Sequence, residues 1–267
     1  MSSNSSSQAP LSRGDRARNI GRTLAVAIAA PAWTLGAVFG AGSLIAVAAV
    51  TGGIAQTGAE IDESSALFQL VLSASVYIFG SIVLLVEPYA IRQMSIARIC
   101  ELVGLVRFPV LKDVGYGLVA WAAYMVLTVA VTALVSQYIP GVNLDQDQEI
   151  GFTSLSSSLD IFYAFLVIVV AAPFIEELAF RGYLYGTLKP HMRWIIASLI
   201  TSVLFGVVHG QVNVGIDTFM LSMVLCYLRD KTGSIWSGVF VHALKNSIAF
   251  YILFVAPKWL SNLIMGS

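Results

Sequence analysis

The sequence predicts an all-α protein, a polytopic transmembrane helical bundle of about seven to eight spans, and three observations support this prediction. Of the 267 residues, 57% are hydrophobic and only 11% are charged, and the mean hydropathy is +0.81. Several apolar runs approach or exceed the roughly 20 residues that a helix needs to cross the hydrocarbon core. These runs lack period-2 alternation, which favours helices over a membrane barrel because backbone groups in lipid must be paired.

Seven apolar runs define the predicted spans. In chain order they are Thr23–Val50, Leu67–Val86, Val114–Val135, Ile161–Ile175, Trp194–Val208, Ile216–Leu228 and Ile235–Ala256. The sixth run is the weakest of the seven. Lys258–Met265 is a candidate for a partial eighth span.

The placement of basic residues predicts that the amino terminus is cytoplasmic, because Lys and Arg accumulate in cytoplasmic connections. The connections at 51–66 and 136–160 carry acidic residues and no Lys or Arg. The net charge is zero because the basic connections and the acidic connections cancel. It gives no reason to expect nucleic acid as a partner. Thirteen of the fifteen basic residues fall in the alternate connections: Arg13, Arg16, Arg18, Arg22, Arg92, Arg98, Arg107, Lys112, Arg181, Lys189, Arg193, Arg229 and Lys231.

Residues 1–20 are expected to form a disordered cytoplasmic tail, since the first eleven are rich in serine, and residues 21–267 a single transmembrane domain. The first apolar run is too long for a secretory signal, so a retained span is predicted. Cys100 and Cys226 indicate neither a disulfide framework nor a cysteine-rich zinc site. Gly-x3-Gly pairs beginning at Gly36, Gly182 and Gly206 are candidates for close helix packing.

The functional prediction begins with Glu176, Glu177 and Arg181, three charged residues that continue the fourth apolar run. Ionisable groups at bilayer depth are costly and normally face a protein interior or a wet cavity. Glu177 and Arg181 are one helical turn apart and can pair, whereas Glu176 is rotated by about 100° from its neighbour. One carboxylate is therefore expected in an ion pair and the other in a cavity. The alternative is a structural salt bridge with Arg181 extended to the headgroups.

Three other polar residues, His209, His242 and Asn246, are predicted at the depth of Glu176. Each alone is better explained by hydrogen bonding at a helix end or between helices. The fourth and fifth spans are expected to form an antiparallel hairpin turning near residue 192, which places Glu176 and His209 each roughly 25 Å from the turn. His242 and Asn246 lie roughly 17 and 23 Å from the basic connection before the last span. This convergence predicts a buried catalytic or ion-binding site.

These residues resemble the motifs of the CAAX-processing and bacteriocin-processing (CPBP, also called Abi) intramembrane proteases. The segments AAPFIEELAFRGYLYG and DKTGSIWSGVFVHALKNSIAF look like bacterial members of that family. The resemblance covers about 160–255, the expected protease core, and no motif is matched in residues 1–159. Three ordered motifs carry it: Glu176-Glu177-x3-Arg181, Phe205-x3-His209 and His242-x3-Asn246.

The resemblance implies an intramembrane endopeptidase. In such enzymes the residues matching Glu176 and His209 activate the attacking water. Those matching His242 and Asn246 stabilise the tetrahedral oxyanion or help to hold a metal. The residues that the resemblance implies as supports of the site are Glu177, Arg181 and Phe205.

Whether zinc takes part is left open by the resemblance. Glu176, His209 and His242 would be three protein ligands of a catalytic zinc ion with an open fourth position. Without a metal, Glu176 and His209 deprotonate the water themselves. The HExxH spacing of many zinc proteases is absent, so we favour the metal-independent glutamate mechanism, although metalloprotease is the conventional family name.

The expected location is a bacterial plasma membrane, and the expected partners are the lipid bilayer and a membrane-anchored protein or peptide substrate. Eukaryotic relatives cut prenylated CAAX proteins, whereas similar bacterial proteins are associated with peptide maturation, bacteriocin self-immunity or regulation of surface proteins. Two alternatives belong to other classes. One is a transporter or ion-coupled carrier that uses the buried Glu/Arg/His cluster as a proton relay, for which the sequence shows no inverted repeat. The other is a non-catalytic membrane immunity protein.

Overall fold

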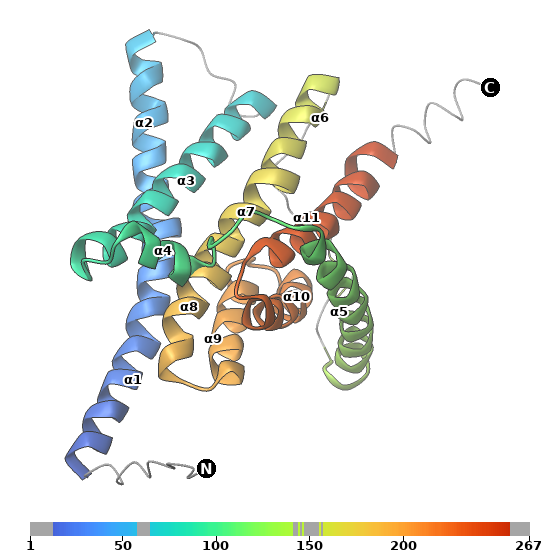
Figure 1. The fold of residues 1–267 in the computed structure, drawn as a ribbon. Coiled ribbons are helices and arrows are strands. Elements are labelled where there is room, and N and C mark those ends of the chain that lie inside the picture. Colours follow the sequence, from blue (N-terminus) through green and yellow to red (C-terminus); the bar gives the residue numbers. More distant parts are fainter. Residues whose placement is uncertain are drawn as a thin grey trace.

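The computed structural model describes residues 13–57, 65–140, 144, 146, 155 and 157–256, and within these ranges the chain is helical and contains no strand (Figure 1). The predicted polytopic helical bundle is confirmed. Within the described part of the chain, six helices are long and apolar enough to cross a membrane: Ala17–Gly53, Ala66–Ile91, Leu111–Tyr138, Ser158–His191, Val212–Thr232 and Trp236–Val255.

Several of these spans combine α-helical and wider π-helical segments. The first two spans and the short helix after them contain α1 (Arg13–Leu35), a π-helical segment (Gly36–Ala41), α2 (Gly42–Thr57), α3 (Ala66–Val86), a second π-helical segment (Glu87–Ile91) and α4 (Ile96–Val103). The third and fourth spans contain α5 (Leu111–Tyr138), α6 (Ser158–Phe165), the π-helical η3 (Leu166–Ala171), α7 (Ala172–Glu176), the π-helical η4 (Glu177–Leu184), α8 (Tyr185–Leu188) and a 3₁₀ turn (Lys189–His191). The remainder contains α9 (Trp194–Val207), α10 (Val212–Thr232), α11 (Trp236–Phe250) and a π-helical end (Tyr251–Val255).

Three expectations about element boundaries are corrected by the structure. Residues 13–20 are helical and begin α1, so the expected disordered tail of residues 1–20 does not extend over them; residues 1–12 lie outside the described ranges. The fourth span continues to His191, so Arg181 lies inside it rather than in a connection. The fifth predicted span is the 14-residue α9, about 21 Å long against a hydrocarbon core of roughly 30 Å. The predicted partial eighth span, Lys258–Met265, falls outside the described residues.

Proline explains where two of the π-helical segments form. Proline has no backbone N–H and its ring clashes with the carbonyl one turn earlier. Pro88 lies in the segment Glu87–Ile91, and the carbonyl of Leu84, four residues before it, accepts instead from Trp33 Nε1 at 3.0 Å. Pro173 is the second residue of α7, which begins immediately after the end of the π-helical η3. The prolines therefore open the helices locally and free carbonyls for side chains of other helices.

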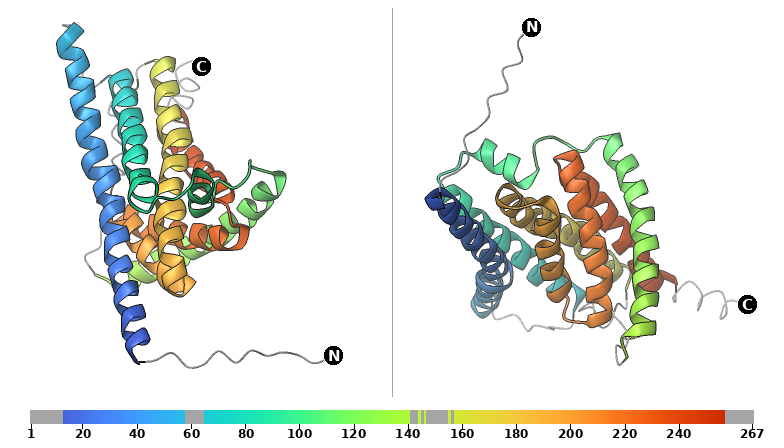
Figure 2. Two further views of the ribbon diagram at one scale, coloured as in Figure 1. Left: turned by 60° about the vertical axis from the view of Figure 1, so that its left-hand side comes forward. Right: turned by 90° about the horizontal axis from the view of Figure 1, so that it is seen from below.

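The bundle is arranged around the fourth span and the hairpin of α9 and α10. The first two helices form one long rod on one side, and α5 lies on the other, beside α10 and α11 (Figure 2). Figure 1 shows α10 nearly end-on while α1 and α6 lie close to the plane of view, so α10 crosses them steeply. The largest buried cluster surrounds Phe180, Tyr183 and Phe205, at the centre of this arrangement.

Two of the three Gly-x3-Gly pairs provide close backbone contacts. A Cβ at Gly182 would lie 2.8 Å from the carbonyl oxygen of Val103 in α4, and one at Gly206 would lie 2.7 Å from the carbonyl oxygen of Gly215 in α10. Side chains at these positions would force the helices apart. The pair beginning at Gly36 does not serve this purpose, because nothing lies within 4 Å of a Cβ placed at Gly36 or Gly40.

Candidate active site

The two adjacent carboxylates of the fourth span occupy different environments. Glu176 ends α7 and Glu177 begins the π-helical segment η4, a type of distortion that is frequent at functional sites. The Glu177 side chain is fully buried, whereas 24% of the Glu176 side chain is exposed. This difference agrees with the expected division into one paired carboxylate and one that faces an accessible space.

Glu177 forms the expected ion pair with Arg181. Glu177 Oε1 lies 2.8 Å from Arg181 Nη1, and both side chains are completely buried. The guanidinium carbon of Arg181 also lies 4.2 Å from the centre of the Phe205 ring, within the range of a cation–π contact. Arg181 therefore does not extend to the headgroups. A buried pair of this kind is costly to break, because the remaining charge would have no compensation.

His242 of α11 lies between the two carboxylates. Its Nδ1 is 3.2 Å from Glu177 Oε1, and its Nε2 is 3.8 Å from Glu176 Oε2. The first distance is compatible with a hydrogen bond, whereas the second is longer than one. Glu177 thus orients the imidazole and leaves Nε2 directed toward Glu176. The sequence paired Glu176 with His209, whereas the structure brings His242 into ion-pair range of it.

His209 lies in the turn between α9 and α10. Its Nδ1 donates to the carbonyl oxygen of Phe205 at 2.6 Å, so in the neutral ring Nε2 is the acceptor. The Phe205 ring contacts the rings of both histidines, with centroids 4.9 Å from His209 and 5.8 Å from His242. The charge of Glu176 acts on His209. Both histidines therefore have Nδ1 engaged and Nε2 available, with Phe205 packed between them.

Asn246 has a different contact from the one expected. Its Nδ2 donates to the carbonyl oxygen of Ile168 at 2.9 Å. In a π-helix each carbonyl oxygen accepts a hydrogen bond from the N–H five residues later. For Ile168 in η3 that residue is Pro173, which has no N–H. Asn246 thus supplies the missing donor and links α11 to the fourth span. The asparagine amide has two N–H groups, so the second is left for another acceptor.

Two residues near the site carry no sequence signal that would have identified them. A Cβ at Gly238, one turn before His242, would lie 2.6 Å from Glu177 Oε2, so glycine makes room for the carboxylate. Tyr77 of α3 lies within electrostatic range of the Glu176 carboxylate. Glycines and tyrosines are common in apolar spans, so neither residue stands out before the helices are packed.

A second polar cluster adjoins the site. Lys245, on the turn of α11 after His242, places Nζ 3.1 Å from Asp217 Oδ2 of α10, and Asp217 Oδ1 accepts a hydrogen bond from the Tyr124 hydroxyl of α5. Lys245 and Asp217 are visible in the sequence as polar residues within apolar runs, but their pairing depends on how three helices pack. The cluster links α5, α10 and α11 beside the histidines.

The zinc alternative requires three donors that come together around one point. Within the described ranges, no three His, Cys, Asp or Glu side chains come together in a group that could hold a metal ion. In this conformation Glu176, His209 and His242 are not gathered into such a group.

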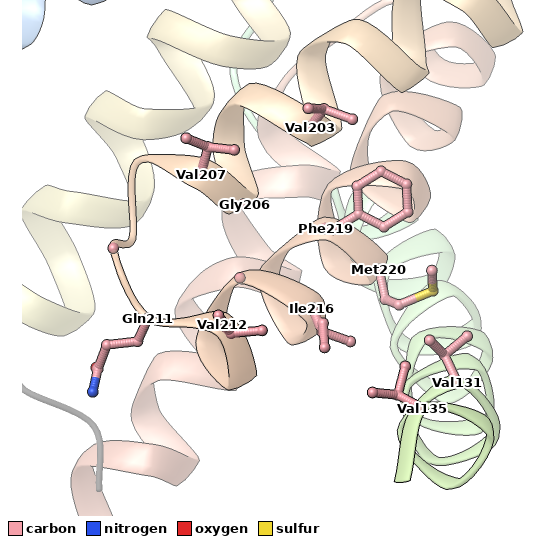
Figure 3. Close-up of a pocket in the computed structure, with 12 residues that line it drawn as sticks. Val131, Val135, Val203, Gly206, Val207, Gln211, Val212, Ile216, Phe219 and Met220 are labelled. Carbon is pink, nitrogen blue, oxygen red and sulfur yellow. The ribbon is translucent and has the colours of Figure 1, made fainter. Parts of the chain in front are cut away.

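An apolar groove of about 510 Å³ runs past the turn that carries His209 (Figure 3). Val207 and Gly210 line it on either side of the histidine, and Phe219 and Val131 line it from α10 and α5. Its lining contains neither Glu176 nor His242. The groove is thus a neighbour of the candidate site and reaches it only at the α9–α10 turn.

Comparisons with known proteins agree with the site. Residues 158–248 match the family model described as "Type II CAAX prenyl endopeptidase Rce1-like". The chain is 31% identical over 93 residues to the Bacillus subtilis (strain 168) protein named "Putative membrane peptidase YdiL", covering 33% of this chain and 38% of that protein. It is 28% identical over 119 residues to "UPF0177 protein YxdF" of Lactococcus lactis subsp. lactis (strain IL1403), covering 44% and 63%. No solved structure matches significantly.

The matched region contains every candidate site residue from Glu176 to Asn246. The alignments span less than two thirds of the length of both curated relatives, so they identify a shared region and not a shared substrate. Together with the buried, contacting motif residues and the helical membrane architecture, they establish an integral membrane protein. Residues 158–248, the part of the chain that carries the three motifs, are similar to the family of type II CAAX prenyl endopeptidases described as Rce1-like.

Proposed function

We propose that the protein is an intramembrane endopeptidase that hydrolyses a peptide bond of a membrane-associated protein or peptide with a water activated by Glu176 and His209. The observation that carries this proposal is the contrast between Glu177, completely buried and paired with Arg181, and Glu176, partly open beside the Nε2 atom of His242. The Glu177 carboxylate is completely buried and held by Arg181 and His242, which leaves it no access to an attacking water. The Glu176 carboxylate is partly accessible and lies 3.8 Å from His242 Nε2.

In the proposed mechanism Glu176 accepts a proton from the attacking water, and its charge also acts on His209. General-base catalysis of this kind contributes roughly a hundredfold to ten-thousandfold to a rate. When protonated on both ring nitrogens, His242 donates through Nδ1 to Glu177 and presents Nε2–H to the developing oxyanion, as preorganised donors do in other hydrolases. The second N–H of Asn246 is the other candidate donor.

The supporting residues act by position. Arg181 and the Gly238 gap hold Glu177 in place, and Glu177 in turn holds the ring of His242. Phe205 separates the two imidazole rings by packing between them. This rigid support keeps catalytic groups within a narrow range of geometry, on which proximity effects depend.

The test is cleavage by the purified chain, in detergent or proteoliposomes, of a membrane-anchored peptide in water enriched in ¹⁸O. Hydrolysis places one labelled oxygen in the new carboxyl terminus, which mass spectrometry detects. Glu176→Ala should abolish both cleavage and label incorporation. If a broad panel of anchored peptides stays intact with the wild-type chain, the carrier and the non-catalytic alternatives gain support instead.

A further inference from the structure

A second cavity of about 510 Å³ lies between α1 and the turn from α8 to α9, and none of the candidate catalytic residues lines it. One wall is an apolar face of α1 formed by Val26, Ala29, Ala30 and Trp33. The single donor of the Trp33 ring is used on the Leu84 carbonyl at 3.0 Å. The indole therefore offers the cavity only apolar surface.

The rim of this cavity is basic. Arg22 of α1, Arg92 after α3 and His191 before α9 line it. The one acid in the lining, Glu87, is occupied, because it lies 3.7 Å from Arg92 and accepts from the Tyr183 hydroxyl at 2.9 Å. The rim thus carries two guanidinium groups and an imidazole but only one carboxylate, and that carboxylate already has partners.

The cavity is fixed to the bundle, and its α1 wall belongs to the candidate membrane span Ala17–Gly53. Thr23 Oγ1 donates to the His191 carbonyl at 3.2 Å, which holds α1 against the turn. On its outward side α1 exposes Ile20, Leu24 and Ile28, which are 62%, 59% and 71% accessible. Large apolar side chains exposed on a membrane helix face acyl chains. A lipid molecule therefore has access to the cavity from the bilayer.

We propose that this cavity binds one anionic phospholipid, with its phosphate between Arg22 and His191 and an acyl chain along the α1 wall. Basic pockets between membrane helices bind anionic headgroups, and here the basic rim continues directly into an apolar wall. A free phosphate ion would use the rim alone, whereas a zwitterionic lipid would gain the wall without net charge attraction. The combination of a basic rim and an apolar wall favours a lipid that has both an anionic headgroup and an acyl chain.

Such a lipid would be a structural part of the candidate protease. Tyr183 and Gly186, which line the cavity, belong to the same span as Glu177 and Arg181 and follow them by a few residues. Occupation of the cavity would fill the space between α1 and this span. We therefore expect the lipid to stabilise the fold, whether or not the chain cleaves peptides.

The test uses the purified full-length chain in neutral detergent, with thermal unfolding and native mass spectrometry as readouts. Phosphatidylglycerol should raise the unfolding temperature and remain bound as one molecule per chain, whereas phosphatidylcholine and glycerol phosphate should do neither. Arg22→Gln should weaken phosphatidylglycerol binding roughly fivefold, the scale of one basic contact near a membrane surface, and Ala29→Phe should block it by filling the wall.

The matched control is Arg18→Gln, one turn earlier on α1 and outside the cavity lining, which should leave binding unchanged. Equal losses for Arg18→Gln and Arg22→Gln would overturn the proposal in favour of general surface attraction. Equal stabilisation by glycerol phosphate would overturn it in favour of a phosphate site, and equal binding of phosphatidylcholine in favour of an uncharged lipid groove.

Discussion

Glu176 and Glu177 show how one residue of displacement along a helix separates two roles. The Glu177 carboxylate contacts Arg181 and His242 and has no exposed surface, while Glu176 keeps about a quarter of its side chain accessible. The sequence predicted this division because helical geometry allows only one of two adjacent residues to meet Arg181. It did not predict that His242 would lie between both carboxylates, since contacts between distant helices are set by packing.

The first prediction separates the two carboxylates by substitution. Glu176→Gln keeps the size but removes the base, so it should leave the unfolding temperature nearly unchanged and reduce cleavage by roughly a hundredfold or more. Glu177→Gln leaves the buried Arg181 without a counter-charge and should destabilise the fold by about 3–5 kcal/mol. Unfolding temperature and cleavage are measured on both variants in the same detergent. If the two phenotypes are exchanged, the assignment of roles is wrong.

The second prediction concerns metal. Because the three candidate ligands do not form a metal-binding group in this structure, we expect purified protein to contain well under one equivalent of zinc and to keep its activity after chelation and removal of the chelator. Elemental analysis and cleavage assays on the same sample provide the measurement. Loss of activity that added zinc restores would contradict the glutamate mechanism and favour the metal version.

At the scale of elements, the sequence predicted the hairpin that brings the first and second motifs together, but not its dimensions. Long apolar runs mark helices because lipid requires internal hydrogen bonding, and basic residues near 189–193 mark the turn. The shortness of α9 and the π-helical segments escaped prediction, since they arise where proline, close-packed glycine and a neighbouring helix change the backbone register. Pro173 was visible, yet its consequence for Ile168 and Asn246 appeared only with α11 in place.

The third prediction tests the link between Pro173 and Asn246. Asn246→Ala should destabilise the fold by about 1–3 kcal/mol, the cost of leaving the Ile168 carbonyl without a partner. Pro173→Ala restores a backbone N–H, so the double variant Pro173→Ala/Asn246→Ala should recover much of the lost stability. Cleavage should stay impaired in the double variant if Asn246 also stabilises the oxyanion. Absence of any recovery in thermal unfolding would show that the carbonyl is not the reason for the contact.

The fourth prediction concerns the close approach of α9 and α10. Gly206→Ala places a methyl group where the Gly215 carbonyl oxygen is only 2.7 Å away, so it should cost about 1–3 kcal/mol through overpacking and shift the turn that carries His209. Gly36→Ala is the matched control, since nothing lies within 4 Å of the added group. Thermal unfolding of both variants decides whether the hairpin contact is as tight as described.

The whole molecule combines charge asymmetry between its connections with a polar cluster inside its spans. Arg181 was counted among the thirteen basic residues of the connections, but it is buried in the site. The remaining twelve all lie outside the acidic connections at 51–66 and 136–160. The rim of the second cavity, with Arg22, Arg92 and His191, is built from that same basic set and its neighbours. The expected orientation and the proposed lipid site thus rest on the same distribution of charge.

The last prediction is the orientation of the chain in the membrane. Because Lys and Arg near span ends are retained on the cytoplasmic side, the connection with Arg92 and Arg98 should be cytoplasmic and the acidic connection at 136–160 external. In a background without Cys100 and Cys226, Ser154→Cys should react with a membrane-impermeant maleimide in intact cells, and Ser95→Cys only after the membrane is opened. Ser95 caps α4 through the Arg98 N–H at 3.4 Å, so its variant needs an expression control. Labelling in the reverse pattern would place the amino terminus outside and move the basic rim of the second cavity to the external leaflet.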